Sequence, residues 1–253
     1  MDLGLKGKKA IVTGGTRGIG RAIATLLAAE GVDVAICARH REGVDRTVAQ
    51  LESAGVKAVG GVVDVADLAA LRSWISEAGD ALSGLDIFVA NVSALAQGMD
   101  EAAWRRGFEI DVMSTVFGIE AALPLLERSP AGAIVAVGST AMAEIYGPTR
   151  SYAAVKAALL PYIKGLARNL AAKNVRANIV SPGNVFFEGG VWDSVRQNNP
   201  EMFGQMLARN PTGRMGTPEE VADAVVFLAS PRASFITGTN LIIDGALTQR
   251  VQY

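Results

Sequence analysis

The sequence has very little of the two residue types on which many metal and catalytic sites depend. Its 253 residues include one cysteine, Cys37, and one histidine, His40. A zinc site built from Cys and His, or a serine hydrolase with a histidine base, has almost none of the residues it needs. Sites built from carboxylates alone are not excluded by this count, but we predict no metal. His40 follows a predicted strand and precedes Arg41, so we expect it in a solvated loop.

The sequence also lacks long apolar runs and an excess of charge of either sign. No apolar run reaches the roughly 18 residues of a membrane span, and the N-terminus shows no charged-then-apolar leader. One cysteine cannot form an internal disulfide, so we expect a cytoplasmic protein. The net charge of -1 gives no electrostatic reason to expect nucleic acid or a membrane as a partner. Small molecules are the expected partners.

What the sequence does contain is a regular alternation of strand-like and helix-like segments. With 50% hydrophobic residues, the chain can bury the core of one large domain, residues 1–253. The alternation predicts an α/β fold, a doubly wound parallel sheet with helices on both faces. The predicted strands are residues 8–13, 33–38, 58–63, 85–91, 132–139, 175–181 and 239–245, and the predicted helical stretches are 18–30, 41–54, 67–82, 100–127, 149–173 and 218–230.

A glycine-rich turn follows the first predicted strand. Residues 13–20 read TGGTRGIG and lead into the helical run RAIATLLAAEG. Glycine lets the chain turn tightly and lets the backbone approach a phosphate, while a helix N-terminus offers free N–H groups and a positive dipole end. The turn therefore predicts a dinucleotide pocket, although a Gly-rich turn between strand and helix is common by itself.

Ser139, Tyr152 and Lys156 form a second candidate site. Residues four apart lie on one face of a helix, so Lys156 brings its ammonium close to the Tyr152 phenol. A nearby cation favours the phenolate, which suits the pair to proton exchange. Ser139, at the end of the preceding strand, can donate a hydrogen bond to a substrate oxygen. The set predicts protonation of a carbonyl while hydride arrives, although this Tyr–Lys spacing also occurs by chance on Ala-rich helices.

Several polar or glycine-containing features come directly after predicted strands. Ligands of a parallel sheet bind beyond the carboxyl ends of its strands, so these features are expected to share one edge and one site. They are the glycine turn, Asp64, Asn91, Ser139 and the pair Pro182-Gly183.

Residues 184–216 predict a long irregular insertion. Loops of this length are usually functional, often as lids, so we expect a substrate loop and an apolar ketone in preference to a free sugar. Packing onto the domain or onto a neighbouring subunit explains its apolar side chains equally well. These are Phe186, Phe187, Trp192, Met202, Phe203 and Met206.

The end of the second predicted strand indicates the choice of cofactor. An NAD enzyme of this kind places an acid there to accept from the ribose 2′-hydroxyl, and that carboxylate repels a 2′-phosphate. Here Arg39, His40 and Arg41 follow the strand, and Arg17 lies in the glycine turn. Arginine forks suit phosphate oxygens, so we predict NADP(H) rather than NAD(H). The alternative is that Arg39 and Arg41 form a solvated basic loop.

Taken together, these motifs resemble the short-chain dehydrogenase/reductase family, and within it the 3-oxoacyl-(acyl-carrier-protein) reductases, over essentially the whole chain. The resemblance implies a Rossmann-like sheet of seven parallel strands, a nicotinamide cofactor, and a homotetramer or dimer built on the helices around residues 100–127 and 149–173. The matching parts are TGGTRGIG, Asp64-Val65, the set Ser139/Tyr152/Lys156, Pro182-Gly183 and the tail RMGTPEEVADAVVFLASPRASFITGTNLIIDG.

The resemblance also implies a role for each matched residue. Tyr152 is the expected acid in reduction and base in oxidation, Lys156 supports it and holds the nicotinamide ribose, and Ser139 polarises the substrate carbonyl. The expected cofactor contacts are Gly14, Thr16, Arg17, Gly18, Ile19, Gly20, Arg39, Asp64, Val65, Asn91, Tyr152, Lys156, Pro182, Gly183 and Val185. The expected substrate contacts are Ser139 and Tyr152, together with Phe186, Phe187 and Trp192 from the 184–216 insertion.

The sequence departs from the family pattern at four places. The family asparagine that completes the catalytic set, acting chiefly through its main-chain carbonyl, falls on Asp111. Its carboxylate is able to attract Lys156 and weaken its hold on Tyr152, or to shift the pH optimum. The family's NNAG turn reads ANVS at residues 90–93, and Phe187 stands where a threonine is expected. Pro161 is expected to bend the Tyr152 helix a turn or two beyond Lys156.

Two alternatives remain beside an NADP(H)-dependent oxidoreductase acting on an apolar ketone or a 3-oxoacyl-type substrate. The first is a non-catalytic NADPH-binding sensor or scaffold, favoured by Asp111 and the altered turn at residues 90–93 and opposed by the intact Ser139/Tyr152/Lys156 set. The second is a dehydratase or epimerase that uses the same tyrosine, which net NADPH consumption would distinguish.

Overall fold

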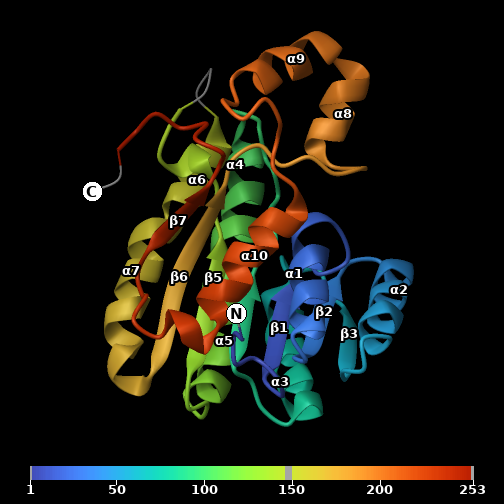
Figure 1. Ribbon diagram of the computed structural model, residues 1–253, viewed down its shortest axis with the longest axis vertical. Helices are drawn as coiled ribbons and strands as arrows, with labels where there is room; N and C mark the ends of the chain where they lie inside the picture. The colour runs from blue at the N-terminus through green and yellow to red at the C-terminus, as the bar shows by residue number, and fades with distance from the viewer. Residues whose placement is uncertain (1, 146–149, 252–253) are drawn as a thin grey trace.

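The computed structural model describes residues 2–145 and 150–251 (Figure 1). All of the predicted strands are present, and they pair in parallel in one seven-stranded sheet of order β3-β2-β1-β4-β5-β6-β7. The predicted doubly wound α/β fold is confirmed. The strands are β1 (Lys9–Thr13), β2 (Asp33–Ala38), β3 (Ala58–Val62), β4 (Ile87–Ala90), β5 (Gly132–Val137), β6 (Val175–Pro182) and β7 (Asn240–Ile243).

Helices cover both faces of the sheet because successive strand residues point to opposite sides and both sides are apolar. Val12 of β1 packs in one apolar layer and its neighbour Ile11 in the other. The first layer includes residues of α1 (Gly18–Ala29), α2 (Arg41–Glu52) and α10 (Pro218–Ala229); the second includes residues of α3 (Leu68–Leu82), α5 (Ser114–Leu126) and α7 (Leu159–Leu170).

Cys37, on β2, belongs to the second of these layers and is fully buried. Burial raises the pKa of its thiol to about 12. Its main-chain oxygen accepts the N–H groups of Gly14 and Gly15 at 2.9 and 3.3 Å. The backbone of β2 therefore holds the start of the glycine turn.

Both of the longest predicted helical stretches are interrupted. Residues 100–127 form α4 (Glu101–Gly107), a π-helical turn (Phe108–Met113) and α5. The second stretch forms α6 (Ser151–Ala157) and α7, separated at Ala158; its predicted start at 149 lies outside the described residues. Pro161 has no N–H to offer the carbonyl of Ala157. The helix is therefore interrupted at Ala158, two residues after Lys156, and a bend a turn or two beyond Lys156 stays a prediction.

The prediction of an irregular stretch at 184–216 is wrong. It contains α8 (Val191–Asn198) and α9 (Pro200–Ala208), which project beyond the carboxyl edge of the sheet at the top of Figure 1. Asn199 caps α9 by accepting the N–H of Met202 at 3.0 Å, with Pro200 at the first helical position. An Asn-Pro pair is a recognised start signal for a helix. The sequence therefore contained a local signal for α9, which the interpretation of the whole segment as one long loop overlooked.

The two ends of this segment are held together. Val185 and Gly216 form an isolated parallel bridge, and Gly216 also accepts the N–H of Phe186 and donates to Asn184, both at 2.9 Å. The segment therefore leaves the domain and returns to it at one point. In the described part of the chain, no helix has the length and apolar character needed to cross a membrane.

Candidate active site

The features predicted to share one edge do so. Because all strands of the sheet are parallel, their carboxyl ends lie on the same side. Thr13 ends β1, Asn91 follows β4, Ser139 comes two residues after β5, and Pro182 ends β6. Asp64 follows β3, at the outer end of this edge, and is exposed.

The glycine turn is fastened to β4 by Asn91. The Asn91 amide donates to the main-chain oxygens of Thr13 and Gly14 at 3.0 and 3.3 Å, and its N–H donates to the Thr13 hydroxyl at 3.0 Å. A methyl group at Gly20 would collide with the Gly14 oxygen and the Asn91 amide. Gly14 also has a φ of +69°, which favours glycine. Asn91, expected at the cofactor, thus has its amide engaged by the turn.

The N-terminus of α1 fits an anionic diphosphate. The first N–H groups of a helix have no partner within it, and Arg17, which precedes α1, provides no side-chain cap. Arg17 and Arg39 are both exposed. A helix N-terminus with a guanidinium group beside it, here that of Arg17, offers donors that suit a phosphate ester. His40 is exposed beside them, as predicted.

The remaining residues predicted at the cofactor lie around the same edge. Thr16 and Ile19 are half-buried in the glycine turn, and Val65 is buried after β3. Gly183 donates its N–H to Ile243 at 2.9 Å, and a methyl group there would come within 2.8 Å of Asp244. Val185 lies in the bridge that closes the 184–216 segment.

Ser139 presents a hydroxyl whose proton is available. It begins a short 3-10 helix (Thr140–Met142), and its Oγ accepts the N–H of Ala141 at 3.2 Å. A serine hydroxyl that accepts one bond still has its own proton to donate. Ser139 itself is half-buried.

Tyr152 and Lys156 lie one turn apart on α6. The Lys156 ammonium is buried and donates to the main-chain oxygen of Val137 at 3.0 Å. Val137 is the last residue of β5, two positions before Ser139. This bond therefore ties the helix that carries Tyr152 to the strand end that carries Ser139. Residues 146–149, between Ser139 and Tyr152, lie outside the described residues.

Asp111 engages Lys156 directly. Its Oδ1 lies 3.0 Å from Lys156 Nζ, with the two side chains only 1% and 2% exposed. That oxygen has no hydrogen-bond partner with good geometry, so its contact with Lys156 is an ion pair and not a well-aligned hydrogen bond. Its Oδ2 accepts the N–H of Ala94 at 3.0 Å, and its main-chain oxygen accepts the Thr115 hydroxyl at 2.8 Å. The carboxylate, rather than the carbonyl, therefore faces the lysine.

Asp111 lies in the π-helical turn between α4 and α5. Turns of this kind are rare and are found frequently at functional sites. The sequence pointed to Asp111 through the family pattern, but nothing in residues 108–113 predicted the π-helical turn.

Sequence reasoning missed Ser151 and Arg150, which hold the start of α6. The Ser151 side chain is buried, and its hydroxyl lies within hydrogen-bonding distance of the main-chain oxygens of Ala96 and Gly98, at 3.0 and 2.8 Å. Arg150 donates to the Gln97 side chain at 3.1 Å. Both residues stand directly before Tyr152, where a serine at the start of a helix was a usable signal.

The aromatic residues of the 184–216 segment pack partly on one another. Phe186 meets Phe203 edge to face, with ring centroids 6.0 Å apart, and the Arg196 guanidinium lies 4.7 Å from the Phe186 centroid. Trp192 is half-buried on α8. Phe187 lies against the glycine turn, since a methyl group at Gly18 would come within 2.6 Å of its ring.

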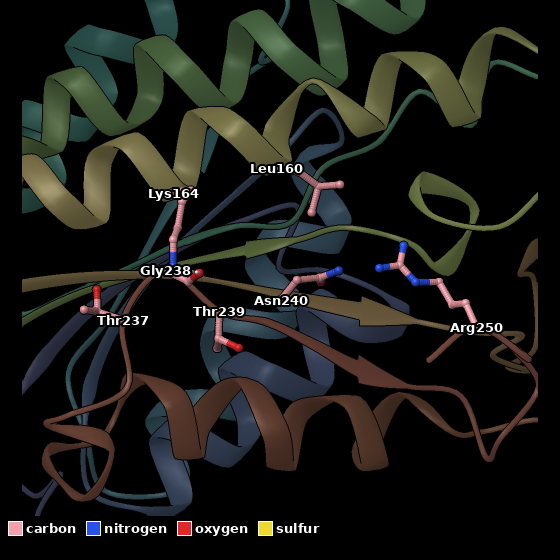
Figure 2. Close-up of a pocket in the computed structure, with 7 residues that line it drawn as sticks. All are labelled: Leu160, Lys164, Thr237, Gly238, Thr239, Asn240 and Arg250. Atoms are coloured by element: carbon pink, nitrogen blue, oxygen red, sulfur yellow. Dashed lines mark hydrogen bonds between the residues drawn. The ribbon is translucent and has the colours of Figure 1, made fainter. Parts of the chain in front are cut away.

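A separate hollow of about 450 Å³ lies between α7 and β7 (Figure 2). Lys164 reaches across it and donates to the Gly238 oxygen at 3.1 Å. Arg250 approaches from the C-terminal stretch, where the N–H groups of Gln249 and Arg250 donate to Glu144 at 3.0 and 3.3 Å. This hollow borders β7, an edge strand of the sheet, and contains none of the predicted site residues. Its lining residues are Leu160, Lys164, Thr237, Gly238, Thr239, Asn240 and Arg250.

Comparison with known proteins decides the family. Residues 14–248 match the family model described as enoyl-(acyl carrier protein) reductase. The protein belongs to the short-chain dehydrogenase/reductase family. Isoepoxydon dehydrogenase of Penicillium expansum is 37% identical over 100% of this chain and 99% of its own. Cis-4-hydroxycyclohexanecarboxylate dehydrogenase of Sinomonas cyclohexanicum is 37% identical over 94% and 96%. The 3-oxoacyl-(acyl-carrier-protein) reductase of Vibrio cholerae is 34% identical over 97% and 99%.

Solved structures of the family superimpose closely on this member. A dehydrogenase/reductase from Sinorhizobium meliloti matches with a TM-score of 0.88 and 32% identity over 98% of both chains. A short-chain dehydrogenase from Burkholderia cenocepacia in complex with NADP matches at 0.86 and 33%, over 96% of this chain and 98% of that one. A 7α-hydroxysteroid dehydrogenase complexed with NADH and 7-oxo glycochenodeoxycholic acid matches at 0.90 and 29%, over 99% and 98%. The prediction of an oxidoreductase of this family is confirmed.

Proposed function

We propose that this member of the family is an NADP(H)-dependent oxidoreductase that interconverts a ketone and a secondary alcohol on an apolar substrate. The observation that carries the proposal is the 3.0 Å bond from Lys156 Nζ to the Val137 oxygen. It joins the Tyr152 helix to the end of the Ser139 strand, at the edge of the sheet where the glycine turn also lies.

In this proposal each side chain has one task. Ser139 donates its proton to the substrate oxygen while its Oγ accepts the Ala141 N–H. Tyr152 gives a proton to that oxygen in reduction and takes it back in oxidation. Lys156, held by Val137 and Asp111, provides positive charge one helical turn from the phenol. The bound nicotinamide cofactor would supply or accept the hydride.

The cofactor preference rests on this chain's own residues, because the structural relatives carry NADP in one case and NADH in another. Arg39 is exposed directly after β2, where an NAD enzyme has an acid. The first turn of α1 would hold the diphosphate, with Arg17 beside it. Arg39 would meet the 2′-phosphate, and Asp64 and Val65 would lie toward the adenine.

The substrate class is proposed from the relatives' names and from the 184–216 segment. One relative is named for a hydroxycyclohexanecarboxylate and another for a 3-oxoacyl group. Phe186, Phe187 and Trp192 provide apolar surface next to the edge. We therefore favour an alicyclic ketone, with 3-oxoacyl thioesters as second choice. We also propose a cytoplasmic homotetramer or dimer.

The test is NADPH oxidation against cyclic ketones, diketones, 3-oxoacyl thioesters and quinones, with NADH in parallel. We expect turnover with at least one cyclic ketone. Replacing Tyr152 with Phe should abolish that turnover while leaving NADPH affinity within a few-fold, because only the acidic proton is lost. Retained activity would mean that another group is the acid. A dehydratase or epimerase would instead convert substrate with no net NADPH consumption.

One observation favours the non-catalytic alternative. The Asp111 carboxylate neutralises Lys156 at 3.0 Å, and a neutralised lysine supports a phenolate less well. Tight NADPH binding without turnover in either direction, across the whole panel, would replace the oxidoreductase with a cofactor-binding sensor.

A further inference from the structure

We propose that Phe187 covers the diphosphate-binding turn and has to leave it when NADPH binds, so that cofactor binding and movement of the 184–216 segment are coupled. This inference rests on the proposed function, because it concerns the same cofactor site. It concerns a residue that stands where the family pattern has a threonine.

The Phe187 ring is held between two glycines. A methyl group on Gly18 would come within 2.6 Å of the ring, and one on Gly190 within 2.9 Å. Side-chain carbons do not approach so closely, so the ring fills the space that a Cβ would need at both positions. Gly18 begins α1, with a φ of +50°. The ring therefore lies against the first residue of the helix end proposed to bind the diphosphate.

The turn that carries Phe187 is fixed to α8. Gly190 donates its N–H to the Phe187 oxygen at 3.0 Å, and the buried Asp193 carboxylate accepts the N–H of Gly189 at 2.9 Å. That bond is the main reason why the pKa of Asp193 is lowered, with Gln197 and Arg196 assisting. Arg17 also reaches the Gly189 oxygen, at 3.5 Å. The ring and the Arg17 guanidinium thus link the glycine turn to the start of α8.

A diphosphate bound at the first turn of α1 would approach Gly18 and recruit Arg17. Both are engaged by residues 187–189 in this structure. Displacing the ring would free the turn that Asp193 holds to α8. Val185 and Gly216 pair at the base of the 184–216 segment, so the segment would move about that one point. A site that is open in only a fraction of molecules shows an affinity reduced by that fraction. Removing the ring should therefore tighten cofactor binding.

The experiment compares wild type with Phe187→Thr and Phe187→Leu by fluorescence titration with NADPH. We expect binding to be roughly fivefold to tenfold tighter for the Thr variant and intermediate for the Leu variant. Phe203→Leu is the matched control, because Phe203 is an aromatic of the same segment that packs on Phe186 instead of Gly18. Circular dichroism melts establish that each variant is folded.

Hydrogen exchange of residues 187–198 is the second readout. NADPH should raise exchange there in wild type, while Phe187→Thr should show raised exchange without cofactor. Unchanged or weaker NADPH binding in the folded Thr variant would overturn the coupling and leave the proposed function intact. Failure of both wild type and the variant to bind NADPH would overturn the proposed function and this inference together.

Discussion

Lys156 and Asp111 form an ion pair from which water is almost excluded. Exposed ion pairs contribute little to stability, but removing one partner of a buried pair costs about 3–5 kcal/mol because the other charge is left uncompensated. Here the lysine keeps one further partner, the Val137 oxygen, and the aspartate keeps the Ala94 N–H. The pair therefore connects the Tyr152 helix, the end of β5 and the stretch after β4.

Replacing Asp111 with Asn should lower stability and change the pH profile. The amide preserves the shape but leaves Lys156 without a counter-charge, so we expect the free energy of unfolding to fall by about 3 kcal/mol. The fuller positive charge beside Tyr152 should also alter the pH dependence of alcohol oxidation. Denaturant titration and kcat/KM against pH measure the two effects. The control is Asp80→Asn at an exposed site, and an unmoved pH profile would count against a role for the carboxylate.

Replacing Arg39 with Asp should alter the choice of cofactor. A carboxylate at the end of β2 would repel a 2′-phosphate and accept from a 2′-hydroxyl. We expect the ratio of NADPH to NADH affinity to fall by roughly tenfold or more. Titration of both cofactors measures it, with Arg46→Asp on α2 as the control for a general change of charge. Equal weakening of both cofactors would contradict phosphate recognition by Arg39.

At the scale of helices and strands, the local signals of the sequence predict most of the order. Strands such as β1 and β5 are short apolar runs bounded by turn residues, and their existence follows from pattern alone. Pro161 made a helix break predictable, but the sequence did not indicate that the break would fall at Ala158. The π-helical turn at 108–113 could not be expected, because no local sequence signal encodes it. Contacts between distant segments, such as Phe187 on Gly18, depend on the folded chain and escape any local pattern.

The candidate site was predictable to a similar degree. Ser139 could be assigned to the carboxyl edge because the topology follows from the alternation of segments, and Tyr152 and Lys156 could be assigned to one helix face by their spacing. The direction of the Asp111 carboxylate could not, because its main-chain oxygen is satisfied by Thr115 and its side chain by Lys156 and Ala94. Those partners come from three different elements, and their mutual placement is a property of the packing.

The stem of the 184–216 segment provides a prediction about pH. Arg214 forms a two-pronged contact with Glu220, at 2.6 and 2.8 Å, and the Thr217 N–H donates to the same carboxylate. The Arg214 hydrogen bond first, and then that N–H, lower the pKa of Glu220 from 4.5 to about 2. A carboxyl group whose pKa is lower in the folded protein stabilises the fold at pH values above its unfolded-state pKa. This stabilisation is lost as the pH falls through the folded-state pKa.

Replacing Glu220 with Gln should therefore lower the melting temperature at pH 7, by a small amount because the pair is largely exposed. The difference from wild type should shrink as the pH falls from about 5 toward 2. Thermal melts across this range measure it, and Glu219→Gln, one residue earlier on the same helix turn, is the matched control. A difference that stays constant with pH would mean that the charge of Glu220 has no part in it.

At the scale of the whole molecule, two surfaces remain that suit further association. Trp104 and Phe108 are 39% and 49% exposed on α4 and the turn that follows, within the region predicted for oligomer contacts. The second is β7, an edge strand beside the hollow of Figure 2, with the fully exposed Phe235 shortly before it in the chain. Exposed aromatic groups and unpaired strand edges favour contacts with another chain.

Replacing Phe108 with Asp tests the proposed homotetramer or dimer. A charge in the centre of an apolar contact is costly to bury, so we expect the mass in solution to fall to that of a smaller assembly. Light scattering with size exclusion measures it, and Glu52→Lys, an exposed charge change on α2, is the control. An unchanged mass in a folded Phe108→Asp variant would exclude this face from the interface.

Cys37 gives this chain a chemical reporter at its centre. It is paired across the sheet with Thr13 of β1 on one side and Gly61 of β3 on the other, and a disulfide reagent reacts with the thiolate alone. With the thiol buried under the second helical layer and its pKa raised to about 12, the rate of labelling reports how often that layer opens. The Cys37 carbonyl also accepts two N–H groups of the glycine turn. A ligand that stabilises that turn should therefore slow the labelling of the Cys37 sulfur without contacting it.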